Sequence, residues 1–307
     1  MKVAVLGTIA VGLVAEVDRL PRPGETVLSR GLTREPAGMG TLQAIAAARL
    51  GAEVALYGRI GADPFGDEIL TTLHGAGVDI APVERMPRLP TGASLVISAP
   101  NRQFLAAHAA GANGEVNEGY VTSFLPQIRE VDALLLDHTL PLPAVAALLR
   151  GLPPTQPLVV LHPMPLVDAP SLPWKRLDFI IGGRDAGTVP AGAPTGAEEA
   201  ARLGQPFLDR GVRHVVTLAS GEGAYLVEKA GTTRFPIREP LVPSPEVRAA
   251  FSAALAVRLA AGRGPYEAVG FANAAATLAA ARREGHRSFP TAAEVQESLS
   301  RPSLPPG

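Results

Sequence analysis

Short apolar segments alternate with longer segments of helical periodicity, and this alternation restricts the fold of the chain more than any other feature. The apolar segments are rich in Val, Ile and Leu and lie at residues 3–6, 54–57, 133–136, 158–161, 179–181 and 215–218. Such runs are typical of strands covered on both faces. Helical periodicity appears near residues 38–50, 66–76, 144–150, 197–210, 245–261, 266–283 and 291–299. The alternation predicts βα units around a mostly parallel sheet, that is, an α/β fold.

Two regions interrupt this alternation. Residues 13–35 contain a turn-rich link between two short extended pieces, and residues 93–108 have the pattern of a hairpin whose turn lies at 99–101. We expect these two regions to form a small separate sheet.

Composition excludes several classes of function. The chain has 307 residues, of which 47% are hydrophobic and 19% charged, as expected for a globular protein. A net charge of −1 gives no electrostatic reason to expect binding to nucleic acid or to an anionic membrane. Cysteine is absent, which excludes disulfides and thiolate metal sites. We see neither a signal segment nor an apolar run of membrane-spanning length, and we therefore expect a cytoplasmic protein.

Polar residues follow two of the predicted strands. Asp137 and His138 come directly after one strand, and His162 follows another. The carboxyl ends of parallel strands are the usual place for ligands in α/β proteins. Two interpretations stay open, namely groups that contact a ligand and polar caps on the strand ends. Neither the G-x-G-x-x-G pattern nor the P-loop pattern of nucleotide binding occurs.

Several motifs occur together in a specific order over nearly the whole chain. They are LGTI at 6–9, VDRLPRPGET at 17–26, AIAAARLG at 44–51, GRIGADPFG at 58–66, GAN at 111–113, FAN at 271–273 and SFPT at 288–291. In this order the chain resembles the ribokinase family, also called PfkB carbohydrate kinases. The resemblance implies a three-layer sandwich with a mostly parallel central sheet and a small β-sheet lid. It implies one domain over residues 1–307, with the lid formed by about 13–35 and 93–108.

The positions that hold the sugar in this family carry unusual residues here. The family's Asn and Asp, which bind sugar hydroxyls, correspond to Ala10 and Gly12. Its Gly-Gly-Lys-Gly-Ala-Asn-Gln signature appears as AGMGTLQ at 37–43, so Met39 and Leu42 replace the Lys and the Asn. A family Glu corresponds to Thr139. The resemblance therefore implies a substrate pocket of reduced polarity, formed by Ala10, Gly12, Gly38, Met39, Gly40, Leu42 and Thr139.

The catalytic segment of the family departs further. Its Asp-Thr-x-Gly-Ala-Gly-Asp-x-Phe motif corresponds to PSPEVRAAF at 243–251, where Phe251 fixes the register and Ala249 takes the place of the catalytic Asp. Glu246 and Arg248 take the places of phosphate-binding glycines. Of the family's Asn-x-x-Glu element only the acid remains, as Asp185. Taken alone, the segment predicts a helix that caps itself, with Ser244 at the N-cap, Pro245 in the first turn and Glu246 favourable to the helix dipole.

Nucleotide contacts are implied more weakly. By resemblance they fall on Thr217, Ser220, Gly221, Gly223, Arg248 and Asn273. An ordinary glycine-rich turn at 220–223 and a packing role for Asn273 are equally compatible with the sequence. We predict no metal site from the residues themselves.

The sequence supports three functional hypotheses. We favour a degenerate family member that binds a small molecule, sugar-like or nucleoside-like, or a partner, without efficient phosphoryl transfer. The alternative is an active ATP-dependent carbohydrate or nucleoside kinase that needs ATP and Mg²⁺, with Glu246 or Asp185 as a displaced base and Arg248 on phosphate. The third is a structural or regulatory dimer with a closed pocket.

We also predict a homodimer through the lid. A small sheet with an apolar face is seldom left bare, and a two-fold partner is the commonest cover. The residues expected to contribute are Val14, Val17, Val96, Ile97 and Phe104.

Overall fold

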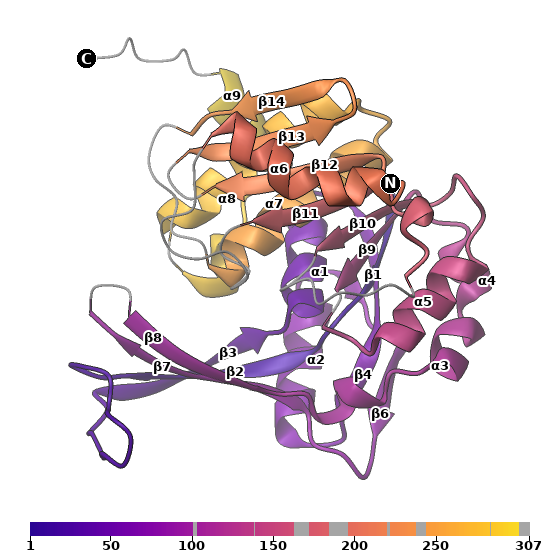
Figure 1. Ribbon diagram of the computed structural model, residues 1–307. Helices are drawn as coiled ribbons and strands as arrows, with labels where there is room; N and C mark the ends of the chain where they lie inside the picture. Colours follow the sequence, from indigo (N-terminus) through magenta and orange to yellow (C-terminus); the bar gives the residue numbers. More distant parts are fainter. Residues whose placement is uncertain are drawn as a thin grey trace, which may run out of the picture.

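The computed structural model describes residues 1–100, 103–137, 139–162, 172–183, 196–219, 222–237, 244–282 and 284–300 (Figure 1). Its elements form a large central sheet with helices on both faces and a second, smaller sheet that extends from one side of the molecule.

The central sheet has ten strands and is mostly parallel. Its order is β14-β13-β12-β11-β10-β9-β1-β4-β5, with β6 paired to β4, and only β12, β13 and β14 pair antiparallel. The predicted strands correspond to β1 (Lys2–Leu6), β4 (Glu53–Gly61), β9 (Ala133–Asp137), β10 (Leu158–His162), β11 (Phe179–Gly183) and β12 (His214–Ala219), which confirms all six. The strands that the sequence analysis missed are β5 (Val78–Asp79), β6 (Val83–Met86), β13 (Gly223–Glu228) and β14 (Gly231–Phe235).

Side chains of each central strand alternate between two separate cores. In β1, Val3 and Val5 belong to one core, whereas Ala4 and Leu6 belong to the other. The first core is covered by α1 (Met39–Arg49), α2 (Pro64–Gly75), α7 (Pro245–Ala260), α8 (Pro265–Arg282) and α9 (Ala292–Ser300). The second is covered by α3 (Glu118–Ser123), α4 (Leu125–Ile128), α5 (Leu142–Gly151) and α6 (Ala197–Asp209). The predicted three-layer α/β sandwich is therefore confirmed.

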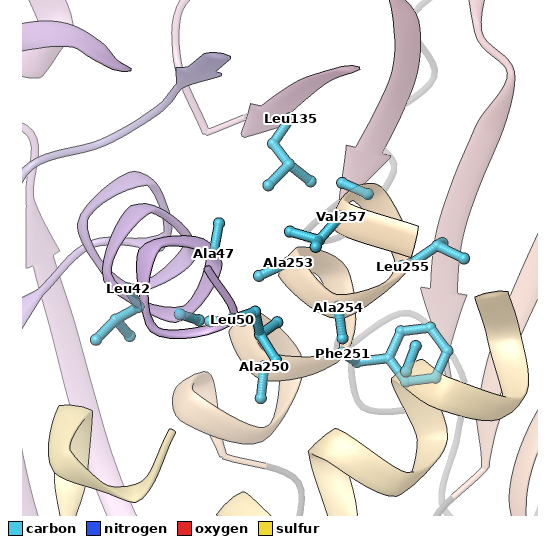
Figure 2. Close-up of a cluster of buried hydrophobic side chains, with 14 of the residues drawn as sticks. Leu42, Ala47, Leu50, Leu135, Ala250, Phe251, Ala253, Ala254, Leu255 and Val257 are labelled. Carbon is cyan, nitrogen blue, oxygen red and sulfur yellow. The ribbon is translucent and has the colours of Figure 1, made fainter. Parts of the chain in front are cut away.

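Helices α1 and α7 pack closely in the first core (Figure 2). The contact is made largely by alanines, among them Ala47 from α1 and Ala250 and Ala253 from α7. Small side chains let the two helix backbones approach each other, because less volume has to be accommodated between them. This packing fixes α7 relative to the strands that it covers.

The small sheet has the strand order β3-β2-β7-β8. It consists of β2 (Ala10–Glu16), β3 (Gly31–Ala37), β7 (Gly92–Ala99) and β8 (Gln103–Ala109). The predicted separate sheet and its hairpin are confirmed, although β2 begins earlier than expected, at Ala10. Its role as a lid and the division of the chain into one domain with a lid stay predictions.

The register of the small sheet places the residues predicted to form its apolar face on two different faces. Paired residues of neighbouring strands point to the same face, so Val14, Val96 and Phe104 share one face while Ile97 lies on the other. Val17 follows β2 and is only 5% exposed. Alternation along each strand, rather than apolar character, decides which side chains share a face.

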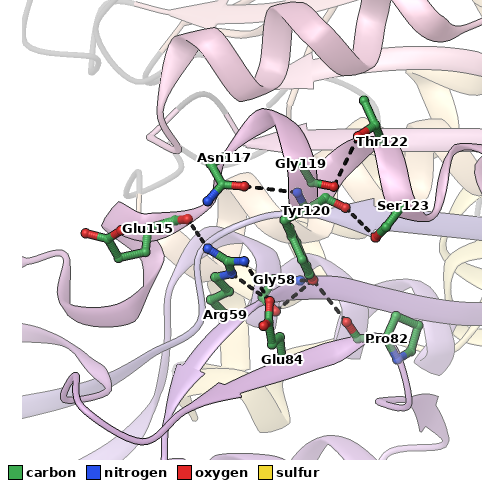
Figure 3. A network of polar contacts seen from close by, with 10 residues as sticks. All are labelled: Gly58, Arg59, Pro82, Glu84, Glu115, Asn117, Gly119, Tyr120, Thr122 and Ser123. Carbon is green, nitrogen blue, oxygen red and sulfur yellow. Dashed lines mark hydrogen bonds and ion pairs between the residues drawn. The ribbon is translucent and has the colours of Figure 1, made fainter.

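A polar network joins β4 to the segment around α3 (Figure 3). Arg59 donates to Glu84 Oε2 at 2.8 Å and to the Glu115 carbonyl, and its guanidinium lies 4.8 Å from the centre of the Tyr120 ring. The Tyr120 hydroxyl accepts from the Gly58 amide at 2.7 Å and lies 2.8 Å from the Gly58 carbonyl. These contacts give the GRIGADPFG motif a structural role at the end of β4.

Candidate functional site

The candidate site lies where α1 and α7 begin, at the carboxyl edge of the parallel strands. The start of α1 is hydrogen-bonded to the segment that follows β1, since the Thr41 amide donates to the Thr8 carbonyl at 3.2 Å. Helix α7 packs against α1 and contacts β1, β9 and β10. In open α/β sheets, ligands bind outside this edge.

Asp137 holds this edge together. Its buried carboxylate accepts four hydrogen bonds, from the Thr8 amide at 3.1 Å and hydroxyl at 2.5 Å, and from the Thr139 amide at 3.0 Å and hydroxyl at 2.7 Å. Such a fully bonded carboxylate fits the interpretation of Asp137 as a polar cap on the end of β9. Thr139 stands, by resemblance, at the position of a sugar-contacting Glu in the family, and its hydroxyl donates a hydrogen bond to Asp137.

The glycines that open α1 are required by the backbone around them. Gly38 has φ of 87°, and a Cβ there would lie 2.5 Å from the Thr8 carbonyl oxygen. A Cβ on Gly40 would lie 2.5 Å from the carbonyl carbon of Gly7. These contacts demand glycine whether or not a ligand approaches.

The side chains predicted to line the substrate pocket are largely inside the protein. Met39 is 8% exposed and Leu42 2%, and both belong to the core beneath α1 and α7. Ala10 is 8% exposed, and Gly12 is also buried. Where the family has polar groups, this chain therefore offers apolar or backbone surface.

Glu35 is a candidate residue that sequence reasoning missed. It pairs with Gly12 across β2 and β3, and a Cβ on Gly12 would lie 3.2 Å from the Glu35 Cγ. Burial raises the pKa of the half-buried Glu35 carboxyl, and the charge of Glu246 raises it further. Only the strand register could have revealed this placement, because Glu35 belongs to no motif.

The first turn of α7 is capped by its own residues. The Ser244 hydroxyl accepts from the Val247 amide at 3.3 Å and donates to Glu246 Oε2 at 2.6 Å, which confirms the predicted N-cap. Ala249 is fully buried. Ser244 therefore occupies one amide at the helix end where the family binds phosphate.

His162 is tied to the same helix. Its Nδ1 lies 2.8 Å from the Ser252 hydroxyl, which donates to the Arg248 carbonyl at 2.9 Å. Buried at 2% exposure, His162 links the end of β10 to α7.

The residues proposed for the nucleotide are spread along the last strands and α8. Thr217 is buried on β12, and a Cβ on Gly223 would lie 2.0 Å from the Phe235 carbonyl oxygen. Asn273 donates through Nδ2 to the carbonyls of Phe235 at 3.2 Å and Pro236 at 3.1 Å. These bonds fit a packing role for Asn273. His138, Asp185, Ser220 and Gly221 lie outside the described residues.

Two further findings concern the described part of the chain. Within it, no three His, Asp or Glu side chains come together in a way that could hold a metal ion. None of its helices combines the length and the apolar character needed to cross a bilayer. At the start of α7, Ser244 accepts from one backbone amide, and Glu246 lies in the first turn.

Comparisons of the sequence with family models and with known proteins agree on one family. The family model for pfkB family carbohydrate kinases matches residues 1–292. Ribokinase of Bacillus subtilis is 29% identical over 299 residues, which cover 97% of this chain and 99% of that protein. Ribokinase of Haemophilus influenzae is 27% identical, with 96% of this chain and 97% of that protein covered.

Solved structures share the fold over nearly the full length. Ribokinase of Thermotoga maritima superposes with a TM-score of 0.83 at 24% identity, covering 97% of this chain and 99% of that chain. Ribokinase of Arabidopsis thaliana, solved with ribose and ATP, gives a TM-score of 0.82 at 24% identity, with 98% and 99% covered. With the family model spanning almost the entire sequence, this chain belongs to the pfkB family of carbohydrate kinases.

Proposed function

We propose that this protein binds a small sugar-like or nucleoside-like molecule without transferring phosphate to it efficiently. The observation that carries the proposal is the start of α7, where the buried methyl group of Ala249 stands at the family's base position and Ser244 caps the helix. The ligand class is supported by relatives, since a ribokinase was solved with ribose and ATP and a nucleoside kinase of Burkholderia thailandensis with inosine.

The magnitudes favour weak catalysis. Loss of a general base costs about 10²–10⁴ in rate. Loss of one donor that stabilises the transition state costs about 10²–10³. The two penalties need not multiply, because groups that act together are not additive. The smaller penalty alone leaves a poor kinase.

Glu35 supports a second candidate function, an active kinase with a displaced base. A carboxyl with a raised pKa is suited to accept a proton from a hydroxyl near neutral pH. Glu35 lies over Gly12, which occupies a sugar-binding position by resemblance, and it interacts electrostatically with Glu246. Glu35 thereby joins Glu246 and Asp185 as a possible base, with ATP and Mg²⁺ as the cofactors.

One assay separates these functions. We would measure ATP turnover with a panel of sugars and nucleosides for the wild type and for Ala249→Asp, Glu35→Gln and Glu246→Gln. We expect turnover far below 1 s⁻¹, the low end of ordinary enzyme rates, in every variant. Ala249→Asp supplies only the base, since Ser244 and Glu246 remain at the helix end. Substrate-dependent turnover near 1 s⁻¹ in the wild type, abolished by Glu35→Gln or Glu246→Gln, would establish the displaced base instead.

Binding is tested independently of turnover. A ligand that binds the native state raises the melting temperature with its concentration. We expect at least one sugar-like or nucleoside-like compound to do so. No stabilisation by any compound of a broad panel would leave only the regulatory or structural dimer.

We further propose a homodimer through the small sheet, in a cytoplasmic protein. One face of that sheet carries leucines that are exposed in the single chain, with Leu32 at 66%, Leu95 at 49% and Leu105 at 49%. Light scattering at micromolar concentration is expected to show a dimer that Leu105→Lys dissociates. The matched control is Leu299→Lys on α9, where the leucine is 47% exposed. A monomeric wild type would contradict the proposal.

A further inference from the structure

A cavity of about 520 Å³ lies beside the last turn of α1. It is bordered by the last turns of α1 and α2 and by the segment from the short helix η4 (Gly285–Ser288) to the start of α9, and it is open to solvent on one side. The residues that matter for its chemistry are Arg49, His286, Arg287 and Thr291, with Ile45 and Phe289 as apolar wall.

Two arginines that line this cavity have no carboxylate partner among the described residues. Arg49 and Arg287 are both exposed, and within the described residues neither guanidinium makes a hydrogen bond or an ion pair. The neighbouring acid, Glu294, is already engaged. It accepts from the Thr291 amide at 2.7 Å and pairs with Arg282 at 2.5 Å. Arg49 and Arg287 therefore bring two permanent positive charges to one cavity, and within the described residues neither pairs with a carboxylate.

His286 lies between this cavity and the candidate site. Burial lowers the pKa of its imidazole, the charge of Arg287 lowers it further, and Glu246 opposes both. On the other side of η4, a Cβ on Gly285 would lie 2.7 Å from Glu35 Oε2. The cavity is thus separate from the candidate site, but η4 contacts both.

We propose that this cavity binds a small organic phosphate. Guanidinium groups suit phosphate because each can donate two parallel hydrogen bonds to its oxygens. Ile45 and Phe289 form the buried floor of the cavity, and its volume is in the range of small-molecule sites. The inference does not depend on the proposed function, since no residue of the cavity belongs to the phosphate-transfer machinery.

Calorimetry with phenyl phosphate, inorganic phosphate and phenol tests the site. We expect saturable binding of phenyl phosphate, weaker binding of inorganic phosphate and none of phenol. The affinity for phenyl phosphate should fall at least tenfold in the Arg49→Gln/Arg287→Gln double variant. Arg150→Gln is the matched control, because Arg150 is likewise an exposed arginine in the last turn of a helix, α5, and it should bind as the wild type does.

The NMR titration of His286 locates the bound anion. A phosphate beside Arg49 and Arg287 adds negative charge near the imidazole, so the pKa of His286 should rise when phenyl phosphate binds. His286→Gln assigns the resonance, and the single variants Arg49→Gln and Arg287→Gln serve if the double variant does not fold. Absence of saturable binding would overturn the proposal. Binding that persists in the double variant with an unchanged His286 pKa would also overturn it, and would place the phosphate elsewhere.

Discussion

Helices α1 and α7 both begin at the carboxyl edge of the sheet and pack against each other, yet their first turns are built differently. The start of α1 keeps Gly38 and Gly40 and has no side-chain cap of its own; the Thr8 hydroxyl accepts from the Met39 amide at 3.1 Å instead. The start of α7 carries no glycine in its first turn and caps itself with Ser244.

This difference between α1 and α7 shows that a glycine at a helix start can be required for two reasons, by the fold or by a ligand. Gly38 and Gly40 touch the backbone of residues 7 and 8, so the fold itself requires them. At α7, where by resemblance the family has glycines that serve the phosphate, this chain has Glu246 and Arg248. Retained glycines in α1 are therefore explained by the backbone around them and carry no information about ligand binding.

The largest effect is expected for Gly40→Ala. The new Cβ would lie 2.5 Å from the Gly7 carbonyl carbon, and backbone on both sides has to shift. We expect a loss of about 3 kcal/mol in the free energy of unfolding. Urea denaturation measures it, with Gly75→Ala in α2 as the control, because a Cβ on Gly75 meets nothing within 4 Å. Equal stability of the two variants would show that α1 does not need its glycines.

Asp137→Ala should be the next most damaging change. It removes the acceptor for two amides and two hydroxyls and releases Thr8, which in turn holds the start of α1. These donors are only partly buried, and their loss of a partner should cost about 2 kcal/mol in total. Asp132→Ala, before the same strand, is the control because Asp132 is exposed and accepts one bond, from the Lys2 amide. Similar denaturation midpoints for the two variants would contradict this role of Asp137.

Ser244→Ala tests the self-capping of α7. Loss of an N-cap side chain costs about 1 kcal/mol, whereas glycine at the same position costs only a few tenths. We therefore expect Ser244→Gly to lie between the wild type and Ser244→Ala in a urea titration. If Ser244→Ala were as stable as the wild type, the cap would not be what holds the first turn of α7.

The smallest effect is expected for Glu35, which pairs with Gly12 of β2 and interacts electrostatically with Glu246 of α7. The pKa of Glu35 is raised in the folded state, so ionisation of Glu35 costs the folded protein free energy. This cost is absent below the unfolded pKa and is complete once the pH has risen through the folded pKa. Glu35→Gln should therefore be slightly more stable than the wild type at pH 7, and the gain should disappear below about pH 4.

Two variants sharpen the result for Glu35. Glu246→Gln removes the second cause of the shift, so an NMR titration should show a lower pKa for Glu35. Glu16→Gln, on the same small sheet but exposed, should change neither quantity. A Glu35 pKa below the ordinary glutamate value would refute the placement of its carboxyl.

Much of the fold could be predicted because it depends on local patterns. The six buried strands are continuous apolar runs, and the cap of α7 is encoded within a few residues by Ser244 and Pro245. Strand β14 (Gly231–Phe235) was missed because it has little apolar character and lies at the sheet edge, whereas β13 (Gly223–Glu228) was missed although it is a buried apolar run. Edge strands bury one face at most, so their sequences carry a weaker signal.

The sequence by itself determined the α/β class and the separate small sheet, and by resemblance it put Ala249 at the family's base position. Only the tertiary structure decided that Glu35 lies over Gly12, that Gly7 meets Gly40 and that Arg49 shares a cavity with Arg287. The reason is physical. Periodicity and capping act between residues a few positions apart, whereas these pairs are brought together by strand register and helix packing, which no local pattern specifies.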